Sequence, residues 1–494
     1  MSDRRSRVVR SGAYAFVASL FVRVIAIVRA VVFARLLIPS EVGRFALAAG
    51  AMATIDALTD TSLRYALVQR PNVTLRAAQT MWTALIVRGA VLTGAGVALA
   101  PTAATLLHAP STIGLMRLVA FVPLLSALQS PAGWLRARDV DLTPQVRLEF
   151  AAATAELLLT VGLILATHSA WGLAGATVLG GCFRVFCSHL IAGFRPAIRF
   201  DRRELLDYLS FGGWISVTTA CWFAATNADD LIVGRIAGTG PLGLYRLAFR
   251  IGHLPVTEVS ETIQKVLFPT LSRMLEAGDD GGDAMFARSL MVASGLSAVI
   301  LAITVPLAHD LVLGLLGPRW LGAVGPLRVL AVAGFIRAVT GPAVALFMAA
   351  GRPRLNAGAT ALSAIVLIVG VALVVGPFGI TGASAMVVAA VAVPLPLWGA
   401  ALHSVGLSPW LCLRIILERA PAALVAGAAA GAVVLAIPSP TVAAVAGLAV
   451  GGAAWLLAVS ILDRPFWGEL RGIFGAMRGA RQRNPVDQGA VDRD

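Results

Sequence analysis

The sequence predicts an all-α polytopic membrane protein of about fourteen transmembrane helices. Three observations indicate this fold class. Hydrophobic residues make up 58% of the 494 positions and charged residues only 13%, whereas soluble domains carry about 25% charged residues. Apolar segments long enough to span a bilayer recur from Ser11 to Leu462. Part of the pattern also repeats after 200 residues, which indicates two similar halves.

The first six predicted spans form an N-terminal bundle, residues 1–200. Each apolar segment is interpreted as one helix, because about 20 helical residues cross the hydrocarbon core of a bilayer. The first segment contains Arg23 and Arg29, is long, and lacks a small-residue cleavage site, so a cleaved signal peptide is not expected. The spans are 12–34, 43–66, 79–100, 113–135, 148–168 and 171–193.

A second bundle of six spans is predicted for residues 201–403. It begins with the polar stretch 201–207, whose amphipathic charge pattern suits a helix lying at the cytoplasmic surface of the membrane. Six apolar segments of spanning length follow. They lie at 207–234, 243–270, 286–310, 322–350, 355–376 and 380–402.

Two additional helices are predicted at 415–437 and 440–462, within a C-terminal region of residues 404–478. Both segments are rich in Ala, Gly and Val and almost free of polar residues. This composition is typical of helices that pack closely or face lipid. The remaining tail, residues 479–494, is polar, and we expect it to be a disordered cytoplasmic segment.

The internal repeat matches segment 33–48 with segment 233–248 without a gap. Six spans, an even number, separate the two copies, so the two bundles should have parallel topology and be related by an axis along the membrane normal. The sequence therefore predicts two facing bundles around a central cavity. The matched pairs are Arg35 with Arg235, Gly43 with Gly243, Phe45 with Tyr245, and Leu47 with Leu247.

The net charge is +14, and most of the basic residues that produce it lie in the loops between the predicted spans. If the chain crosses at every predicted span, the Arg clusters fall on one side, and opposite loops such as 101–112 and 376–380 contain no Lys or Arg. This positive-inside pattern predicts that both termini are cytoplasmic. The basic surplus then meets anionic lipid, and no nucleic-acid partner is expected. The exceptions to the pattern are Arg35, Arg44, Arg235, Arg319 and Arg328.

Several kinds of catalytic and metal site have no signature in the sequence. We find no phosphate-binding P-loop, no dinucleotide fingerprint and no histidine ligand cluster. The cysteines lie in or beside predicted spans and are interpreted as small buried apolar residues. The longest outer loop, about 309–325, leaves no room for a folded catalytic domain. We therefore predict a protein that is not an enzyme and that needs no cofactor.

Charged residues inside the predicted spans are the candidate functional residues, because such charges usually face a water-filled cavity or one another. Asp56, Asp60 and Arg64 share one helix face, and Glu261 and Lys265 repeat the last two at an offset of 201. We predict a role in ion coupling or gating for Asp56, Asp60, Arg64, Asp229, Glu258, Glu261 and Lys265.

Four arginines are predicted to line the cavity as cations that bind the substrate: Arg23, Arg29, Arg88 and Arg250. Arginine stays ionised in proteins and binds phosphate through a planar fork. A cavity lined with arginines therefore suits a diphosphate or another anionic group, and it suits an organic cation poorly.

Structural alternatives to these roles remain open at this stage. Arg64 and Lys265 lie near enough to a membrane surface for their side chains to extend to it. The pairs Asp60–Arg64 and Glu261–Lys265 could equally be neutralising pairs that only stabilise a buried interface. Asp229 is followed by another acidic residue, Asp230, and because the two cannot face the same way, at most one should line a cavity well.

Short motifs also occur in a fixed order along nearly the whole chain. They lie at 34–45 (ARLLIPSEVGRF), 63–70 (LRYALVQR), 227–235 (NADDLIVGR), 243–245 (GLY), 266–273 (VLFPTLSR), 316–320 (LGPRW) and 350–354 (AGRPR). Their order and spacing resemble the Wzx-type oligosaccharide and polysaccharide flippases of the multidrug/oligosaccharidyl-lipid/polysaccharide (MOP) exporter superfamily. Within that family, the chain looks closest to the branch that exports capsule and exopolysaccharide repeat units.

The resemblance implies a function. It implies that polyprenyl-diphosphate-linked oligosaccharides, the building units of capsule, exopolysaccharide or O-antigen, move across the bacterial cytoplasmic (inner) membrane. It further implies alternating access between two bundles, coupled to an ion gradient. The expected partners are this substrate and membrane lipids, with a polysaccharide polymerase and glycosyltransferases as candidate protein partners.

Three other interpretations stay open. One is a cation-coupled drug or metabolite antiporter of the same superfamily, which would need an acidic cavity. Another is a flippase for a peptidoglycan-precursor lipid. The third is a membrane enzyme of polysaccharide assembly, such as a polymerase or ligase, and the short outer loops argue against it.

Overall fold

The computed structural model describes residues 21–22, 24–60, 63, 74–138, 143–191, 194, 196–276 and 281–472. Within these ranges the chain consists of helices joined by short loops. The predictions made for Arg23, Arg64 and the tail 479–494 fall outside the described residues. Most of the predicted span 12–34 does too, although residues 24–36 form a helix.

The first part of the chain folds in the predicted order of spans. The hydroxyl of Thr74 accepts a hydrogen bond of 3.1 Å from the amide of Ala77 and so caps the long third helix of this series. After the helix at 24–36 come α2 (Pro39–Leu58), α4 (Leu75–Leu106), η1 (Pro110–Thr112), α5 (Ile113–Val119), α6 (Val122–Leu128), α7 (Ala132–Arg138), α8 (Thr143–Thr167) and α9 (Ala170–His189).

The second part continues in the same way, with two π-helical turns. Asp201 caps the first of these helices by accepting hydrogen bonds from the amides of Arg203 and Glu204. The elements are α10 (Arg202–Ala237), α11 (Thr239–Gly252), η2 (Pro255–Ser260), α12 (Glu261–Glu276), α13 (Gly282–Asp310), η3 (Leu311–Leu316), η4 (Pro318–Ala323), α14 (Val324–Ala349), α15 (Pro353–Ala392), α16 (Leu395–Ser404), α17 (Pro409–Leu417), α18 (Ala420–Ala436) and α19 (Pro440–Leu462).

The helices confirm a polytopic α-helical membrane protein. Among the described residues, nine helical segments are long and apolar enough to cross a membrane. One of them, Arg354–Ser404, has 51 residues, far more than the roughly 20 of one crossing. It leaves the helical conformation at Gly379, whose φ of 61° suits glycine. This kink lies between the predicted spans 355–376 and 380–402. The count of fourteen itself stays a prediction.

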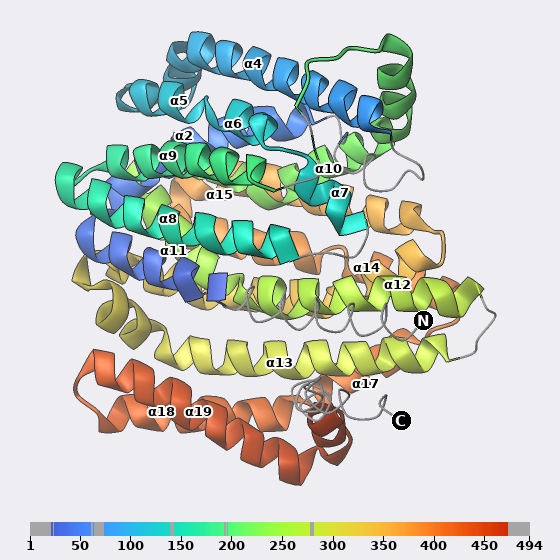
Figure 1. The fold of residues 1–494 in the computed structure, drawn as a ribbon. Coiled ribbons are helices and arrows are strands. Elements are labelled where there is room, and N and C mark those ends of the chain that lie inside the picture. The colour runs from blue at the N-terminus through green and yellow to red at the C-terminus, as the bar shows by residue number, and fades with distance from the viewer. Residues whose placement is uncertain are drawn as a thin grey trace, which may run out of the picture.

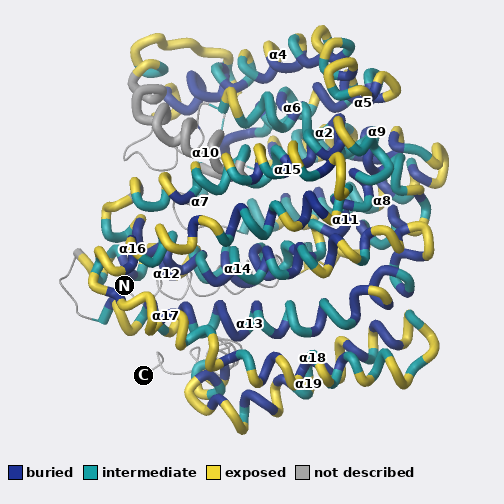
Figure 2. Tube along the Cα trace, turned by 180° about the vertical axis from the view of Figure 1, so that it is seen from behind, coloured by how far each residue is buried: buried dark blue, intermediate teal, exposed yellow. Residues whose placement is uncertain are grey.

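The helices lie side by side, with α4, α5 and α6 at one edge and α18 and α19 at the other (Figure 1). α18 and α19 pack on each other and on α13. α14 lies in the interior and is largely buried, whereas the outer helices carry exposed residues (Figure 2). Many of these are large and apolar, including Leu424 and Leu435, which are 70% and 90% exposed. Apolar outer surfaces suit a protein that faces lipid.

The two copies of the repeat meet where α2 crosses α11. A Cβ atom added to Gly43 would lie 1.7 Å from the Thr239 carbonyl oxygen and 2.9 Å from the Gly243 nitrogen. A Cβ atom added to Gly243 would lie 1.9 Å from the Pro39 carbonyl oxygen. The two backbones are therefore in direct contact, and only glycine fits at either position.

Four of the five arginines that departed from the positive-inside pattern bind backbone carbonyls. Arg35 Nε donates to the Leu315 oxygen at 2.7 Å, and Arg235 Nη1 donates to the Leu106 oxygen at 2.7 Å. Arg44 and Arg328 bind other backbone carbonyls. Carbonyls at helix C-termini lack helical partners and carry partial negative charge. Arg35, at the end of η3, and Arg235, at the end of α4, therefore stabilise helix ends.

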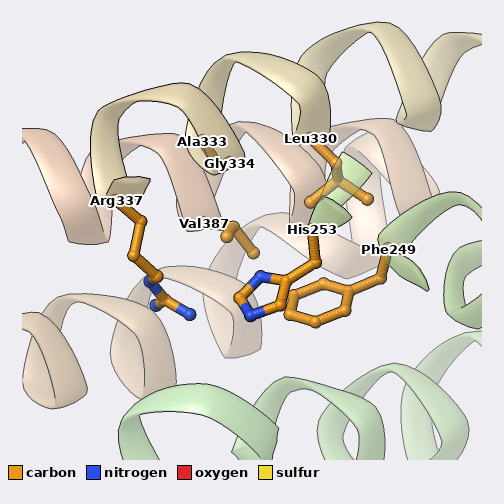
Figure 3. A pocket seen from close by; sticks show the side chains of 7 residues that line it. All are labelled: Phe249, His253, Leu330, Ala333, Gly334, Arg337 and Val387. Atoms are coloured by element: carbon orange, nitrogen blue, oxygen red, sulfur yellow. The ribbon is translucent and has the colours of Figure 1, made fainter. Parts of the chain in front are cut away.

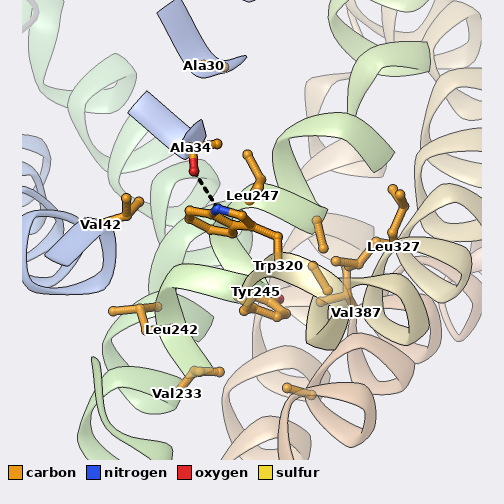
Figure 4. Close-up of a cluster of buried hydrophobic side chains, with 14 of the residues drawn as sticks. Ala30, Ala34, Val42, Val233, Leu242, Tyr245, Leu247, Trp320, Leu327 and Val387 are labelled. Carbon is orange, nitrogen blue, oxygen red and sulfur yellow. Dashed lines mark hydrogen bonds between the residues drawn. The ribbon is translucent and has the colours of Figure 1, made fainter. Parts of the chain in front are cut away.

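Two of the family-like motifs also meet in the core. The Trp320 ring is fully buried, and its Nε1 donates a hydrogen bond of 2.7 Å to the Ala34 oxygen (Figure 4). Tyr245 and Leu247 of α11 lie in the same apolar cluster. Motifs 34–45 and 316–320, far apart in sequence, are thus joined by one hydrogen bond.

Candidate functional site

A cavity of about 720 Å³ lies between the helix 24–36 and helices α2, α8, α9, α10 and α11. It continues along η2 to the first residue of α12. Its wall combines apolar residues with hydroxyl, amide and charged groups, among them Phe33, Phe45, Thr160, Thr177, Thr226, Asn227, Arg29, Arg246, Arg250, Glu258 and Glu261. This volume is within the usual range for sites that bind small molecules and cofactors.

Three arginines line this cavity in the described part of the chain: Arg29, Arg246 and Arg250. Arg246 and Arg250 are one helical turn apart on α11, so they share a face. Arg250 Nη2 donates a hydrogen bond of 3.2 Å to the Ala26 oxygen, which connects α11 with the helix 24–36. Positive charge is therefore supplied from both sides of the cavity.

Two of these arginines have carboxylate partners outside the cavity wall. Arg29 Nη1 donates to Glu156 Oε1 of α8, and Arg246 Nη1 donates to Asp230 Oδ2 of α10. The Asp230 side chain is only 6% exposed. Each carboxylate holds its arginine in place, and the buried Asp230 in particular needs such a partner, whereas Glu156 is 26% exposed.

A second cluster of polar side chains, Asp229 with Tyr245, lies outside the wall of the large cavity, between α10 and α11. Asp229 Oδ2 accepts a hydrogen bond from the Tyr245 hydroxyl, while Asp229 Oδ1 is buried without a hydrogen-bond partner in the described residues. The charge of Arg337, on α14, also acts on this carboxylate. Consecutive acids on α10 thus reach consecutive residues, Tyr245 and Arg246, on α11. Neither acid lines the large cavity.

Arg337 also lines a small pocket beside this group, with His253 and Phe249 (Figure 3). The pocket has a volume of about 10 Å³, close to the space that one water needs. The His253 ring stacks on Phe249 with centroids 5.1 Å apart. Because His253 also lines the large cavity, the two spaces share one wall residue.

Acidic residues line the cavity at η2 and the start of α12. Glu258 and Glu261 both face it, and the Thr257 hydroxyl lies 3.4 Å from Glu258 Oε1. π-Helical turns occur often at functional sites. Close approach of α14 accompanies this turn, since a Cβ atom on Gly334 would lie 2.0 Å from the Gly252 oxygen.

The predicted site residues are therefore divided among several places. Arg29, Arg250, Glu258 and Glu261 line the cavity. Arg88 does not line it. This arginine binds Asp56 Oδ1 at 2.8 Å and the Thr59 oxygen at 2.9 Å, at the C-terminal end of α2.

Two further described candidates, Asp60 and Lys265, lie outside the wall of the cavity. Asp60 lies at the same end of α2 and has a polar or charged partner. Lys265 is exposed on α12, and among the described residues no ion pair joins it to Glu261. The predicted functional roles of all these residues stay predictions.

Sequence reasoning did not select Glu156, Asp230, Arg246 or Arg337 as site residues. Their only signal in the sequence is a charge inside an apolar segment. The partner of Glu156, Arg29, is 127 positions away in the chain, and Asp230 and Arg246, although only 16 positions apart, lie on different helices. Helical periodicity gives the face on which a charge lies, but it does not give the helix that this face meets.

Comparisons with known proteins identify the family of the chain. A family model described as "Polysaccharide biosynthesis protein" matches residues 32–325. The chain is 23% identical over 356 residues to the lipopolysaccharide biosynthesis protein WzxC of Escherichia coli, covering 70% of this chain and 71% of that protein.

Solved structures show the same fold at low sequence identity. The lipid II flippase MurJ aligns with a TM-score of 0.74 and 12% identity, over 91% of this chain and 99% of its own. A multidrug MATE transporter of the MOP superfamily aligns with a TM-score of 0.55 and 14% identity, over 83% of this chain and 94% of its own. At these identities the likeness concerns the fold alone.

Proposed function

The chain belongs to the polysaccharide biosynthesis protein family, and we propose that it is a transporter of lipid-linked oligosaccharides. It moves polyprenyl-diphosphate-linked repeat units from the cytoplasmic to the outer leaflet of the cytoplasmic membrane, for assembly of a surface polysaccharide. The relative WzxC, named for lipopolysaccharide biosynthesis, supports this class of substrate.

The observation that carries the proposal is the cationic wall formed by Arg29, Arg246 and Arg250. A diphosphate in hydrocarbon would leave its charges and polar oxygens unsatisfied, at a cost of several kcal/mol for each group. Arginine offers a planar fork that matches phosphate oxygens. A cavity with three arginines lowers this barrier while the polyprenyl tail stays in the bilayer.

The rest of the wall suits the sugars. Hydroxyl and amide groups of Thr160, Thr177, Thr226 and Asn227 can exchange hydrogen bonds with sugar hydroxyls. Phe33 and Phe45 offer apolar surface to the less polar faces of sugar rings. The wall therefore matches a head group that is anionic at one part and neutral and polar at the other.

The finer architecture and cycle are part of the proposal. Fourteen helices form two parallel bundles, 1–200 and 201–403, with both termini cytoplasmic, and the bundles alternate access to the cavity. Glu258 and Glu261 in the wall, together with Asp229 behind it, are the candidates for coupling to an ion. Arg88 with Asp56, and Asp60 beside them, are candidates for gating at the end of α2. Polymerase and glycosyltransferases are the proposed partners.

One observation favours a second candidate function. Glu258 and Glu261 would also suit an organic cation, as in a drug or metabolite antiporter. The three arginines on the same cavity oppose this, because they repel a cation.

The test compares export in a strain that lacks this gene, complemented with wild type, Arg250→Gln or Arg29→Gln. We expect wild type to restore surface polysaccharide, and each variant to reduce it at normal protein level while lipid-linked repeat units accumulate. Unimpaired export by both variants would remove these arginines from the mechanism. Drug resistance conferred by wild type, with no effect on polysaccharide, would favour the antiporter.

A further inference from the structure

The three cavity arginines differ in their partners. Arg29 is paired with Glu156 and Arg246 with Asp230. In the described part of the chain, Arg250 has no carboxylate partner, and its hydrogen bond goes to a backbone carbonyl. The positive charge that is left to bind an incoming anion therefore differs among the three arginines.

Each carboxylate packs against protein on the side away from its arginine. Glu156 packs against Gly180 of α9, where an added Cβ atom would lie 3.3 Å from Glu156 Cγ, so the glycine makes room for this side chain. Asp230 is buried between α10 and α11. Neither carboxylate lines the cavity. They touch the arginines and not the substrate space.

The pairs leave part of each guanidinium available. Both Arg29 and Arg246 use Nη1 for the carboxylate, and neither makes a second hydrogen bond to a described residue. A guanidinium has five N–H donors, and one edge of two nitrogens is enough to bind a phosphate. The Nε and Nη2 edge can bind phosphate while the carboxylate keeps its hold.

Building on the proposed function, we propose that Glu156 and Asp230 are positioning residues that orient Arg29 and Arg246 and limit the strength of diphosphate binding. The three arginines and the two carboxylates that pair with two of them carry a net charge of +1 together, and Glu258 and Glu261 of the same wall add further negative charge to the cavity. The arginines attract a diphosphate, and the carboxylates keep it from being bound too tightly. A carrier must release its substrate on the far side, so binding that is too tight slows transport.

Replacing Glu156→Gln or Asp230→Asn tests this directly. Each change keeps the shape and an acceptor oxygen for the arginine but removes one negative charge. We expect purified protein in detergent to bind a short-chain polyprenyl diphosphate about tenfold more tightly, since a unit charge at this range in a protein is worth at least that factor. Export in cells should become slower, because release is slower.

A second ligand distinguishes an effect of charge on the affinity from an effect of altered packing. The polyprenyl monophosphate of equal chain length carries less charge, so its affinity should rise by a smaller factor in both variants. Glu149→Gln is the matched control. Glu149 lies on the same helix, α8, and pairs with Arg184 at 2.6 Å, but Arg184 does not line the cavity. This variant should bind both ligands as wild type does.

Four results would overturn the inference. They are unchanged or weaker diphosphate binding by the folded variants, equal gains for both ligands, the same gain in Glu149→Gln, or failure of both Glu156→Gln and Asp230→Asn to fold. If only one variant folds, it decides alone. Wild-type protein that binds no polyprenyl diphosphate would instead contradict the proposed function.

Discussion

Gly43 and Gly243, which hold equivalent places in the two copies of the repeat, lie back to back where α2 crosses α11. A side chain on either glycine would collide with backbone atoms of the opposite helix. The contact between the two copies therefore depends on the absence of two Cβ atoms.

Replacing Gly243 by Ala should separate the two helices. The new Cβ atom would lie 1.9 Å from the Pro39 oxygen, so we expect a loss of about 1–3 kcal/mol, as for other overpacked sites. Thermal unfolding in detergent measures this loss. Gly240→Ala on the same helix is the control, because nothing lies within 4 Å of its Cβ position. Equal stability of both variants would show that the crossing tolerates a side chain.

Replacing Arg35 by Gln should weaken the end of η3. Arg35 donates hydrogen bonds to the Gly314 and Leu315 oxygens, and hydrogen bonds from charged groups contribute about 1.5–3 kcal/mol. We expect a lower unfolding temperature than for wild type. The control is Arg319→Gln, an exposed arginine in the same region. If both variants unfold at the same temperature as wild type, Arg35 does not stabilise the end of η3.

Replacing Trp320 by Phe should leave the Ala34 oxygen without its donor. The phenyl ring is also smaller than the indole, so a small cavity adds to the effect of one unsatisfied buried carbonyl, worth about 1–3 kcal/mol. The unfolding temperature should fall, while Trp410→Phe, at a side chain that is 72% exposed, should have no effect. Stability equal to wild type would mean that water replaces the indole donor.

Tyr245 and Asp229 should be energetically coupled. Tyr245→Phe removes the hydrogen bond to Asp229 Oδ2. The other oxygen of this buried carboxylate, Oδ1, has no hydrogen-bond partner among the described residues, so the variant leaves both oxygens unpaired. We expect a marked loss of stability in this variant and a much smaller loss when Asp229→Asn is already present, since the charge is then gone. Unfolding temperatures of the two single variants and the double variant measure the coupling. Additive losses would contradict a direct interaction.

Much of the fold could be predicted from the sequence, because it depends on local patterns. Apolar length gave the order of the helices, and the break between 376 and 380 coincides with the kink at Gly379. The register of the repeat matched Gly43 with Gly243. Sequence alone does not tell whether two matched residues touch, because residues related by an axis meet only if they lie close to it. The family resemblance is confirmed by the match over residues 32–325.

The candidate site could be predicted only in part. Arg29 and Arg250 line the cavity, whereas Arg88 lies at the end of α2 with Asp56, and the binding role predicted for all three stays a prediction. All three are charges in apolar segments, and nothing local distinguishes them. Which charge faces the cavity depends on how each helix is rotated against its neighbours. The pairing of Arg29 with Glu156 depends on the same packing.

The arginine caps have a consequence for how this protein can change over generations. Arg35, from the first copy of the repeat, binds carbonyls that follow the second copy, and Arg235, from the second, binds a carbonyl that follows the first. Each copy thus supplies an arginine that binds a helix end following the other copy. Hybrids that join the front of one homologue to the back of another should lose these contacts wherever the receiving carbonyls have shifted. A change at either arginine, or a shift of the carbonyl that it binds, therefore removes a contact between the two halves of the chain.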